Sequence, residues 1–428
     1  MHCKMSRVML VSISATLFFV TNVWNINLIE FSGSWRPLQG INNDTSTNST
    51  SQQHNASLQQ ADDELFFAQH WPTLKQTLCP NQTPNSLTFQ TLFELARIEL
   101  QLPQSQIITT HSGDIYAINK FFSFSPGGLG YSSNDKKSYM AYLRIFKAGN
   151  DQIRGNLLAQ LNSAGGTVWD KNTLHELIAT IPSSVSTNET CIITVVRDPI
   201  THFLSAYNEI EWRHEDRIRD QTLESSYIPK YRLLQNGTQE RYIKFVTDFI
   251  QGPSSNGIYR NKPRGIEEIT HVFSMVGPLY ELDRLRKKKQ KGGENSGDMP
   301  RLTAYMSNMT NLDDAFPKFL HSNCKLPKEV TTFTKKITHG SQGDEFYFYK
   351  IAKKVWKEAQ DIQTTGIDKD ERSNSTSSFE VSRALCAIHT MDYACFDNIP
   401  VPKFCRGVYM QDHFRERLYN ATDTSAIS

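Results

Sequence analysis

The amino-acid sequence predicts an α/β protein with a mostly parallel central sheet, preceded by a single transmembrane helix and a polar stem. Three observations favour this fold class: short apolar runs alternate with segments of helical periodicity, an uncharged segment lies near the amino terminus, and a stretch poor in large apolar residues follows it. The 428 residues are 38% hydrophobic and 21% charged, which is ordinary for a globular chain. Length alone allows two or three domains, but the chain has no second linker of comparable length, and one large domain is the simplest account.

The amino-terminal segment has the length of a membrane-spanning helix. The range Val8–Ile29 holds 22 residues without a charge, and a bilayer core needs roughly 20. Lys4 and Arg7 precede the segment and Glu30 follows it, so the tail 1–7 is expected in the cytosol. A cleaved signal peptide is the alternative, but no small-x-small cleavage site follows the apolar core. Either interpretation sends the rest of the chain into the secretory lumen.

A glycosylated, flexible stem is expected over residues 30–65, followed by a folded lumenal domain over 66–428. The stem is rich in Asn, Ser, Thr and Gln, and such a stretch cannot bury enough apolar surface to offset its ordering entropy. Asn-x-Ser/Thr sequons, three of them in the stem, suit a lumenal chain. They lie at Asn43, Asn48, Asn55, Asn81, Asn188, Asn236, Asn308, Asn374 and Asn420.

The cysteines indicate disulfides and not a metal site. Cys3 would be cytosolic, and the other six permit three disulfides whose pairing the sequence leaves open. These six are Cys79, Cys191, Cys324, Cys386, Cys395 and Cys405. Three of them fall within about 380–428, which we expect to be a disulfide-tied carboxyl-terminal part. No CxxC pair has zinc-site spacing, so no metal is expected.

The first elements of the domain each follow from a residue pattern. Ser86–Leu102 has a broad apolar face at helical spacing, which predicts an amphipathic helix. Tyr139–Phe146 predicts a strand ending at a glycine-containing turn, and Asp151–Leu161 predicts a helix directly after it. Cys191–Val196 is β-branched and almost wholly apolar, as expected for a strand covered on both faces.

The alternation continues in the second half of the chain. Ile200–Arg219 predicts a helix, and His271–Val276 predicts a weaker third strand. Asp344–Ile362 predicts a long helix, with apolar positions three to four residues apart. Strand, turn and helix in alternation indicate an α/β domain with a mostly parallel sheet.

The first segment with chemical meaning is the turn Phe146-Lys147-Ala148-Gly149, between a predicted strand and a predicted helix. Gly149 permits close backbone approach, and free backbone N–H groups at a helix start make an anion site that the helix dipole strengthens. Lys147 adds a mobile positive charge. The spacing is not the GxxxxGK[ST] of nucleoside triphosphatases. For this turn taken alone, a plain surface turn is the alternative.

The second segment begins with Arg197-Asp198-Pro199, at the end of the second buried strand. The arginine offers a planar fork of donors that suits a phosphate. Ser205 lies eight residues later, about two turns into the predicted helix, and its hydroxyl can add a bond to the same phosphate. The alternative is a structural Arg197–Asp198 ion pair.

Together the two segments resemble motifs of the Golgi membrane-bound carbohydrate sulfotransferases. Arg197-Asp198-Pro199, with Ser205 eight residues on and Ala-Tyr next, resembles their 3'-phosphate-binding motif. The Phe-Lys-Ala-Gly turn, 50 residues upstream, resembles their 5'-phosphosulfate loop, and residues 272–285 resemble a later strand with its continuation. The resemblance implies a P-loop-like three-layer fold and a single-pass type II protein of the Golgi membrane. It also implies a sulfotransferase that uses 3'-phosphoadenosine 5'-phosphosulfate (PAPS) as co-substrate, without a metal.

The resemblance also implies which residues bind the donor. They are Lys147, Ala148, Gly149, Asn150, Asp151, Gln152, Arg197 and Ser205. Family loops usually place Ser or Thr after the glycine, whereas this chain has Asn150 and Asp151. An amide can donate a hydrogen bond in place of the hydroxyl, and Asp151 would have to point away from the phosphosulfate as a helix cap.

The reaction implied is an in-line displacement at sulfur, which requires an aligned acceptor and a general base. Lys147 would stabilise charge on the leaving phosphate oxygen. His175 and Glu176, which lie between the two motifs, are the first candidates for the base, ahead of Glu209, Glu211 and His214. For each of these side chains, a solvated position on a helix is the alternative.

The acceptor implied by the resemblance is a glycan or proteoglycan. The net charge of +2 and the pI near 8.1 are too mild to indicate a nucleic-acid partner. The run from Arg284 to Lys291 is the strongest basic cluster and could hold an anionic polysaccharide or the donor's phosphates, with an exposed loop as the alternative. A different transferase or kinase would need a magnesium-binding Asp, and none is convincing beyond Asp198. A catalytically silent glycan-binding protein on the same fold remains the main alternative function, and six cysteines are too sparse for a disulfide-rich adhesion module.

Overall fold

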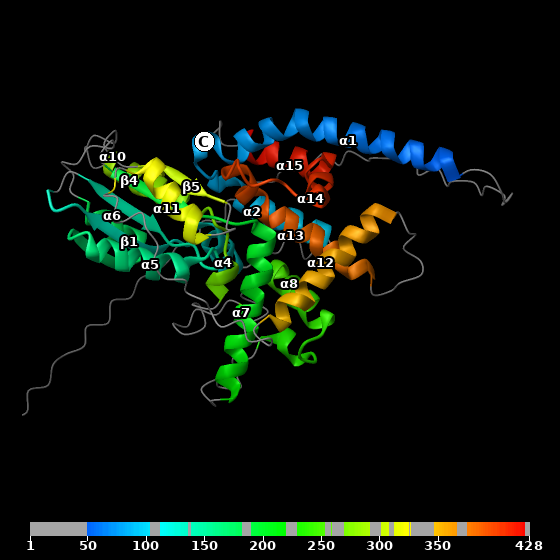
Figure 1. Cartoon of the computed structure of the whole chain (residues 1–428). Coiled ribbons are helices and arrows are strands. Elements are labelled where there is room, and N and C mark those ends of the chain that lie inside the picture. The colour runs from blue at the N-terminus through cyan, green and yellow to red at the C-terminus, as the bar shows by residue number, and fades with distance from the viewer. Residues whose placement is uncertain are drawn as a thin grey trace, which may run out of the picture. The chain divides into compact units, whose positions relative to one another are not determined.

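The computed structural model describes residues 49–102, 112–135, 138–181, 190–219, 229–252, 258, 269–291, 301–307, 312–324, 326, 346–365 and 375–423 (Figure 1). Residues 56–428 belong to one compact unit, and residues 1–55 to another. The elements along the chain are α1 (Ser49–Leu78), η1 (Pro80–Gln82), η2 (Ser86–Thr88), α2 (Phe89–Glu99), α4 (Ser112–Ser123), β1 (Pro126–Ser132), β2 (Tyr139–Leu143), α5 (Asn150–Ser163), β3 (Thr167–Thr173), α6 (Leu174–Ala179), β4 (Thr190–Val195), α7 (Pro199–Arg219), η5 (Lys230–Leu233), α8 (Gln239–Gln251), η6 (Thr270–Val272), α10 (Gly277–Lys291), β5 (Ala304–Met306), α11 (Leu312–Asn323), α12 (Tyr347–Thr365), α13 (Ser375–Cys395), α14 (Lys403–Tyr409) and α15 (Asp412–Asp423).

The strands form one mixed sheet in the order β3-β1-β2-β4-β5. β2 pairs with β4, and β4 with β5, in parallel, whereas β1 is antiparallel to both β2 and β3. The prediction of a mostly parallel sheet is therefore wrong, because two of the four pairings are antiparallel. The prediction missed β1 and β3 because neither has an apolar or alternating pattern: β1 reads PGGLGYS, and β3 reads TVWDKNT with most side chains at least partly exposed.

The glycines of β1 allow its two neighbouring strands to approach closely. A Cβ atom on Gly130 would lie 2.0 Å from Nε1 of Trp169, and one on Gly127 would lie 1.8 Å from the carbonyl oxygen of Lys171. A side chain at either position would collide with β3. The glycines make β1 difficult to predict from strand propensity, but its close packing against β3 requires them.

Helices cover both faces of the sheet. On one face, Met140 and Tyr142 of β2 pack in a cluster with residues of α5 and α11. On the other face, Ala141 and Leu143 pack in a cluster with residues of α6 and α10. This alternation is the two-residue period of a strand that is buried on both sides. A disulfide between Cys191 and Cys324 ties β4 to the end of α11.

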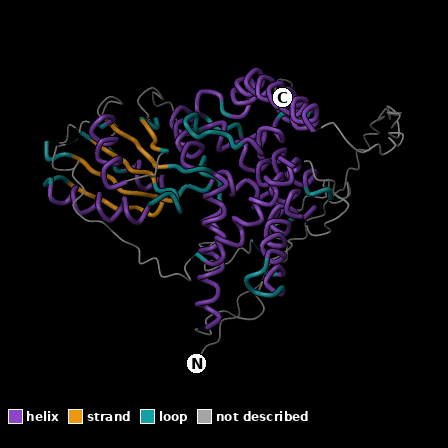
Figure 2. Tube along the Cα trace, turned by 45° about the vertical axis from the view of Figure 1, so that its right-hand side comes forward, coloured by secondary structure: helices purple, strands orange, loops and turns teal. Residues whose placement is uncertain are grey.

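A helical region adjoins the sheet and contains the largest apolar core. Figure 2 shows the strands gathered on one side and helices alone on the other. The core draws residues from α2, α4, α7, α8, α12 and α13, and α13 lies within it, with Ala384, Ala387 and Ile388 fully buried. The disulfides Cys79–Cys395 and Cys386–Cys405 fasten α13 at its end and along its length. The carboxyl-terminal part is therefore central to the fold and not an appendage.

Two further predictions differ from the structure. His271–Val276 is not a strand: the 3-10 helix η6 and a short turn lead directly into α10, and the backbone N–H of Ser274 donates to the carbonyl of Phe121. An apolar run of six residues does not by itself distinguish a strand from another buried segment. The stem predicted for 30–65 is helical from Ser49 onward, as the first part of α1. The predicted helices at Ser86–Leu102, Asp151–Leu161, Ile200–Arg219 and Asp344–Ile362 are confirmed within a few residues.

The expectation of a membrane-spanning protein needs correction. Among the helices in the described ranges, none combines the length and the apolar character needed to cross a bilayer. The predicted tail at 1–7 and span at 8–29 lie outside the described residues. The described fold therefore does not include the predicted transmembrane helix. The single-pass Golgi membrane localisation depended on that helix and is corrected with it.

Candidate functional site

The ends of two neighbouring strands bring the two predicted phosphate-binding segments together. β2 and β4 are adjacent and parallel, with Leu143 opposite Thr194. Their carboxyl ends therefore lie at the same edge of the sheet, where ligands of open α/β sheets usually bind. The turn around Lys147 follows β2, and Arg197 follows β4.

The turn after β2 holds two residues in the left-handed region. Lys147 has φ 58° and Gly149 has φ 69°, and Gly149 is the N-cap residue of α5. A left-handed lysine is uncommon, and such strain concentrates at functional sites. The backbone N–H groups of the first turn of α5 have no partner within the helix and are suited to an anion. Asn150, Asp151 and Gln152 form that turn, but their side chains lie outside the description.

Arg197 connects the two segments directly. Its Nη1 atom donates a hydrogen bond of 2.9 Å to the carbonyl oxygen of Lys147. Burial lowers the pKa of the Arg197 guanidinium, while Tyr349 and Asp198 act in the opposite direction. The group remains a cation, since arginine does not deprotonate in proteins.

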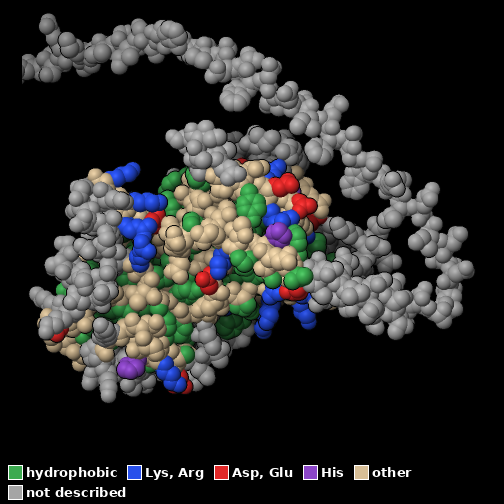
Figure 3. All heavy atoms as spheres, turned by 90° about the horizontal axis from the view of Figure 1, so that it is seen from above, with side chains coloured by type: hydrophobic (Ala, Val, Ile, Leu, Met, Phe, Trp, Pro, Cys, Tyr) green, Lys and Arg blue, Asp and Glu red, His purple; other side chains and the backbone are tan. Residues whose placement is uncertain are grey.

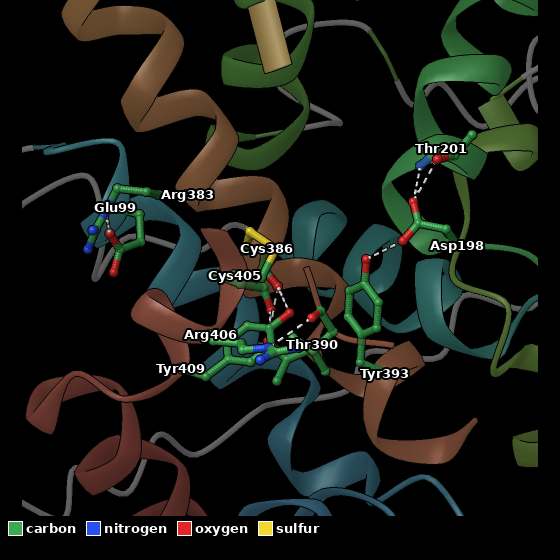
Figure 4. The surroundings of a disulfide bond; sticks show 12 residues. Glu99, Asp198, Thr201, Arg383, Cys386, Thr390, Tyr393, Cys405, Arg406 and Tyr409 are labelled. Carbon is green, nitrogen blue, oxygen red and sulfur yellow. Dashed lines mark hydrogen bonds and ion pairs between the residues drawn. A yellow bond between two sulfur atoms is a disulfide. The ribbon is translucent and has the colours of Figure 1, made fainter. Parts of the chain in front are cut away.

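Asp198 does not form the structural pair with Arg197 that was the alternative interpretation. Its Oδ1 accepts hydrogen bonds from the backbone N–H and the hydroxyl of Thr201, both at 2.7 Å. Its Oδ2 accepts a hydrogen bond of 2.7 Å from the hydroxyl of Tyr393 on α13 (Figure 4). Asp198 therefore caps the first turn of α7 and holds it against α13. Nη1 of Arg197 donates to the turn instead.

Lys147 forms an ion pair within the site. Its Nζ lies 2.7 Å from Oε2 of Glu209, and the other carboxylate oxygen of Glu209 lies 2.6 Å from Nε of Arg213. The side chains of Lys147 and Glu209 are 25% and 16% exposed, so solvent reaches both. Burial raises the pKa of the Glu209 carboxyl, but the charges and hydrogen bonds of Lys147 and Arg213 outweigh it and lower the pKa to about 2.

His202 supports the turn from the interior of the protein. Its Nε2 lies 2.7 Å from the carbonyl oxygen of Phe146, and its side chain is almost fully buried. Because a carbonyl can only accept, Nε2 carries the hydrogen. Burial, followed by the charge of Arg197, lowers the pKa of His202 to about 3, so the ring is neutral at pH 7. The sequence argument overlooked His202, and its position on the inner face of α7, five residues after Arg197, was the available clue.

A small pocket borders the turn on the same side as His202. It is half-open and lined by Phe124, Pro126, Ile145, Phe146, His202, Thr270, Phe273, Ser274 and Pro278. Its walls are mostly apolar rings and aliphatic side chains. The pocket is no larger than a single water requires, and it lies beside the turn after β2.

The remaining sequence-predicted residues are distributed over several positions. Ser205 is half-buried on α7, one helical turn before Glu209. His175 and Glu176 are exposed on α6, which begins where β3 ends. The carboxyl end of β3 lies at the same edge of the sheet as that of β2, with β1 between them. Within the described residues, neither side chain forms a hydrogen bond or an ion pair with Lys147 or Arg197.

Glu211 and His214, the last candidates for the base, differ from Glu209. Glu211 is fully buried on the inner face of α7, against Arg232 and Arg241. His214 is half-buried one turn after Glu211. Of the three candidates on α7, Glu209 is the one paired with Lys147.

The basic run lies on a helix and not on a loop, because α10 continues to Lys291. Arg284 pairs with Glu281, and Lys287 pairs with Asp283. In Figure 3, Lys and Arg side chains gather on the side of the molecule that holds the sheet. α10 begins at the site, where Pro278 lines the pocket, and its basic residues lie toward the other end of the helix.

A metal-binding cluster of three or more His, Cys, Asp or Glu side chains is absent from the described part of the chain. Comparisons of the chain with protein-family models, with curated proteins and with solved structures find no match.

Proposed function

We propose that this protein is a sulfotransferase that moves a sulfuryl group from PAPS to a hydroxyl or amine of a glycan. The observation that carries the proposal is the 2.9 Å hydrogen bond from Arg197 to the carbonyl of Lys147. This bond joins the turn proposed to bind the 5'-phosphosulfate to the arginine proposed to bind the 3'-phosphate. Both lie at the ends of neighbouring parallel strands, and PAPS needs one binding group for each of its two phosphate positions.

Each side chain has a definite part in the proposed reaction. Arg197 and Ser205 hold the 3'-phosphate, and the turn at Lys147–Gly149 with the start of α5 holds the 5'-phosphosulfate. The acceptor oxygen or nitrogen attacks sulfur, and the bond between sulfur and the bridging phosphate oxygen breaks. That oxygen keeps the electron pair, and Lys147 stabilises its charge. The acceptor's proton passes to a base.

Glu209 is the carboxylate best placed to serve as the base. Lys147 and Glu209 are in direct contact, so a lysine that turns to the donor leaves Glu209 beside the reacting atoms. Losing one of its two cationic partners raises the pKa of the carboxyl from about 2 toward its ordinary value, which makes it a better proton acceptor. His175 and Glu176 remain alternatives for this role from the α6 side of the edge.

The experiment that tests the proposal is calorimetric titration of the purified protein with 3',5'-adenosine bisphosphate. We expect micromolar binding by the wild type and a loss of about 30-fold or more in Arg197→Ala, because a buried charge-assisted contact to phosphate is removed. Arg417→Ala is the matched control: this arginine is 40% exposed on α15 and has only a 4.0 Å contact with Glu94. Its affinity should equal that of the wild type.

No binding by a well-folded wild-type protein would overturn the sulfotransferase proposal. The catalytically silent glycan-binding protein would then be favoured. One observation supports that alternative: the ammonium of Lys147 is paired with the carboxylate of Glu209. Binding of glycans without binding of the bisphosphate would identify it.

A further inference from the structure

A buried cluster of charged and phenolic side chains lies behind the proposed site, between α7, η5 and α8. Glu211 comes from α7, Arg232 from η5 and Arg241 from α8, and their side chains are 0%, 3% and 6% exposed. The rings of Tyr207, Tyr231 and Tyr242 surround them and are almost fully buried. The proposed reaction uses none of these residues.

The hydrogen bonds of the cluster converge on one carboxylate oxygen. Oε2 of Glu211 accepts from Nη2 of Arg241 at 2.5 Å and from Nη2 of Arg232 at 3.5 Å. Nη1 of Arg241 donates to the carbonyl of Leu234 at 3.4 Å. These contacts use only a part of the ten N–H donors that two guanidinium groups offer.

The cluster has more donors and more positive charge than its partners satisfy. Among the described side chains, two guanidinium groups face one carboxylate, an excess of one positive charge. Within the described residues, Nε and Nη1 of Arg232, Nε of Arg241 and the hydroxyls of Tyr231 and Tyr242 have no hydrogen-bond partner. Burying an uncompensated charge and several unpaired donors is strongly unfavourable.

We propose that this cluster binds one monovalent inorganic anion, with chloride as the natural occupant. One negative charge balances the excess, whereas a dianion such as sulfate would reverse it. A spherical ion accepts N–H and O–H donors from any direction, which suits groups contributed by two separate elements, η5 and α8. Oε1 of Glu211 also lacks a partner, and a buried water could satisfy it. A water could satisfy single N–H groups as well, but it cannot cancel the charge.

The bound anion joins the donors of η5 and α8, and Glu211, which pairs with Arg232 and Arg241, links both elements to the inner face of α7. Glu209 and Ser205 are half-buried on the same helix, two and six residues before Glu211. The anion therefore stabilises the helix that carries part of the proposed site. The inference does not depend on sulfotransfer, because it concerns only charge and burial.

Thermal unfolding in different salts tests the proposal. The wild-type protein would be unfolded in sodium chloride and in sodium gluconate at equal ionic strength and pH, with sodium bromide as a third salt. An anion that binds only the folded state raises Tm, and above its Kd the rise follows the logarithm of the anion concentration. We expect Tm to be about 3 °C higher in 100 mM chloride or bromide than in gluconate. Equal Tm values in the three salts would overturn the proposal.

A variant localises the effect. In Arg232→Met the charge excess is gone, so the difference between chloride and gluconate should disappear, while Arg417→Met should keep it. If the cluster holds no anion, Arg232→Met removes a buried unpaired charge and should raise Tm equally in every salt, which contradicts the proposal. If this variant does not fold, crystals of the wild type soaked in bromide test the same proposal. An anomalous diffraction peak between Arg232 and Arg241 would support the anion site, and the absence of a peak would refute it.

Discussion

At the scale of single residues, the pairing of Lys147 with Glu209 is the interaction that most affects the chemistry of the site. The two residues are 62 positions apart and meet because β2 and β4 end side by side. The pair holds the ammonium of Lys147 in position and lowers the pKa of the Glu209 carboxyl. The same contact places a carboxylate next to the lysine that meets the phosphosulfate in the proposed reaction.

The depressed pKa of Glu209 predicts how acid affects stability. The folded-state pKa is about 2 against an ordinary value of 4.5, so the contribution is complete above pH 4.5 and is lost as pH falls toward 2. Its size is about 2–3 kcal/mol in the free energy of unfolding. Urea unfolding between pH 2 and 7 should show a flatter acid limb in Glu209→Gln than in the wild type. Glu176→Gln, at an exposed position on α6, should leave the limb unchanged.

The same variant tests the role of Glu209 as the base. Glu209→Gln releases Lys147, so affinity for 3',5'-adenosine bisphosphate should be kept or increased. Sulfuryl transfer should fall by about 10²- to 10⁴-fold, as for the loss of a general base. Unchanged transfer in this variant, with loss of transfer in His175→Asn or Glu176→Gln, would assign the base to α6 instead.

At the scale of elements, β1 shows how a strand can form against local propensity. It contains three glycines and a proline in seven residues, and it is nevertheless buried along its whole length. The stabilisation comes from its two neighbours, β2 and β3, and from the Trp169 ring that lies over Gly130. Because β1 is antiparallel to both β2 and β3, those two strands run in the same direction. Both therefore end at the edge of the sheet where the candidate site lies.

Gly130→Ala should therefore destabilise the protein by about 1–3 kcal/mol, because the new methyl group would lie 2.0 Å from the Trp169 indole. The matched control is Gly407→Ala on α14. There the new methyl group lies 3.1 Å from the flexible end of the Gln363 side chain, and alanine favours a helix. Urea unfolding of both variants measures the difference. A smaller loss at Gly130 than at Gly407 would contradict the close packing of β1 and β3.

At the scale of the whole molecule, three disulfides join segments that are distant in sequence. Cys79–Cys395 spans 316 positions, Cys191–Cys324 spans 133 and Cys386–Cys405 spans 19. The longest one fastens the segment after α1 to the end of α13, the helix inside the main core. This bond therefore connects the beginning and the end of the compact unit.

Removing the longest disulfide should cost more than removing the shortest. By chain entropy alone, Cys79–Cys395 contributes about 6 kcal/mol and Cys386–Cys405 about 3 kcal/mol. Paired Cys→Ala variants, compared by urea unfolding under non-reducing conditions, measure the two losses. All four cysteines are buried, so the apolar contribution of the substitution is similar in both pairs. The reverse order would show that the native contacts of α13 and α14 outweigh the entropy of the denatured chain.

Several parts of the fold and site could be predicted from local patterns. Apolar residues recur with the period of a helix or a strand in six elements, and this pattern is visible in a short window of sequence. These elements are α2, α5, α7, α12, β2 and β4. Lys147 and Arg197 could be placed at strand ends because each follows directly after a strand that was predicted. The number of disulfides that could form followed from a count of cysteines.

Other features depend on contacts between distant segments. The antiparallel placement of β1, the three cysteine pairs and the meeting of Lys147 with Glu209 are not encoded in any one window of sequence. The same holds for the cluster of Glu211, Arg232 and Arg241, whose charge excess arises only when α7, η5 and α8 pack together. The physical reason is that short-range propensity sets the type of an element, whereas burial and charge pairing select its neighbours, and both are properties of the folded chain.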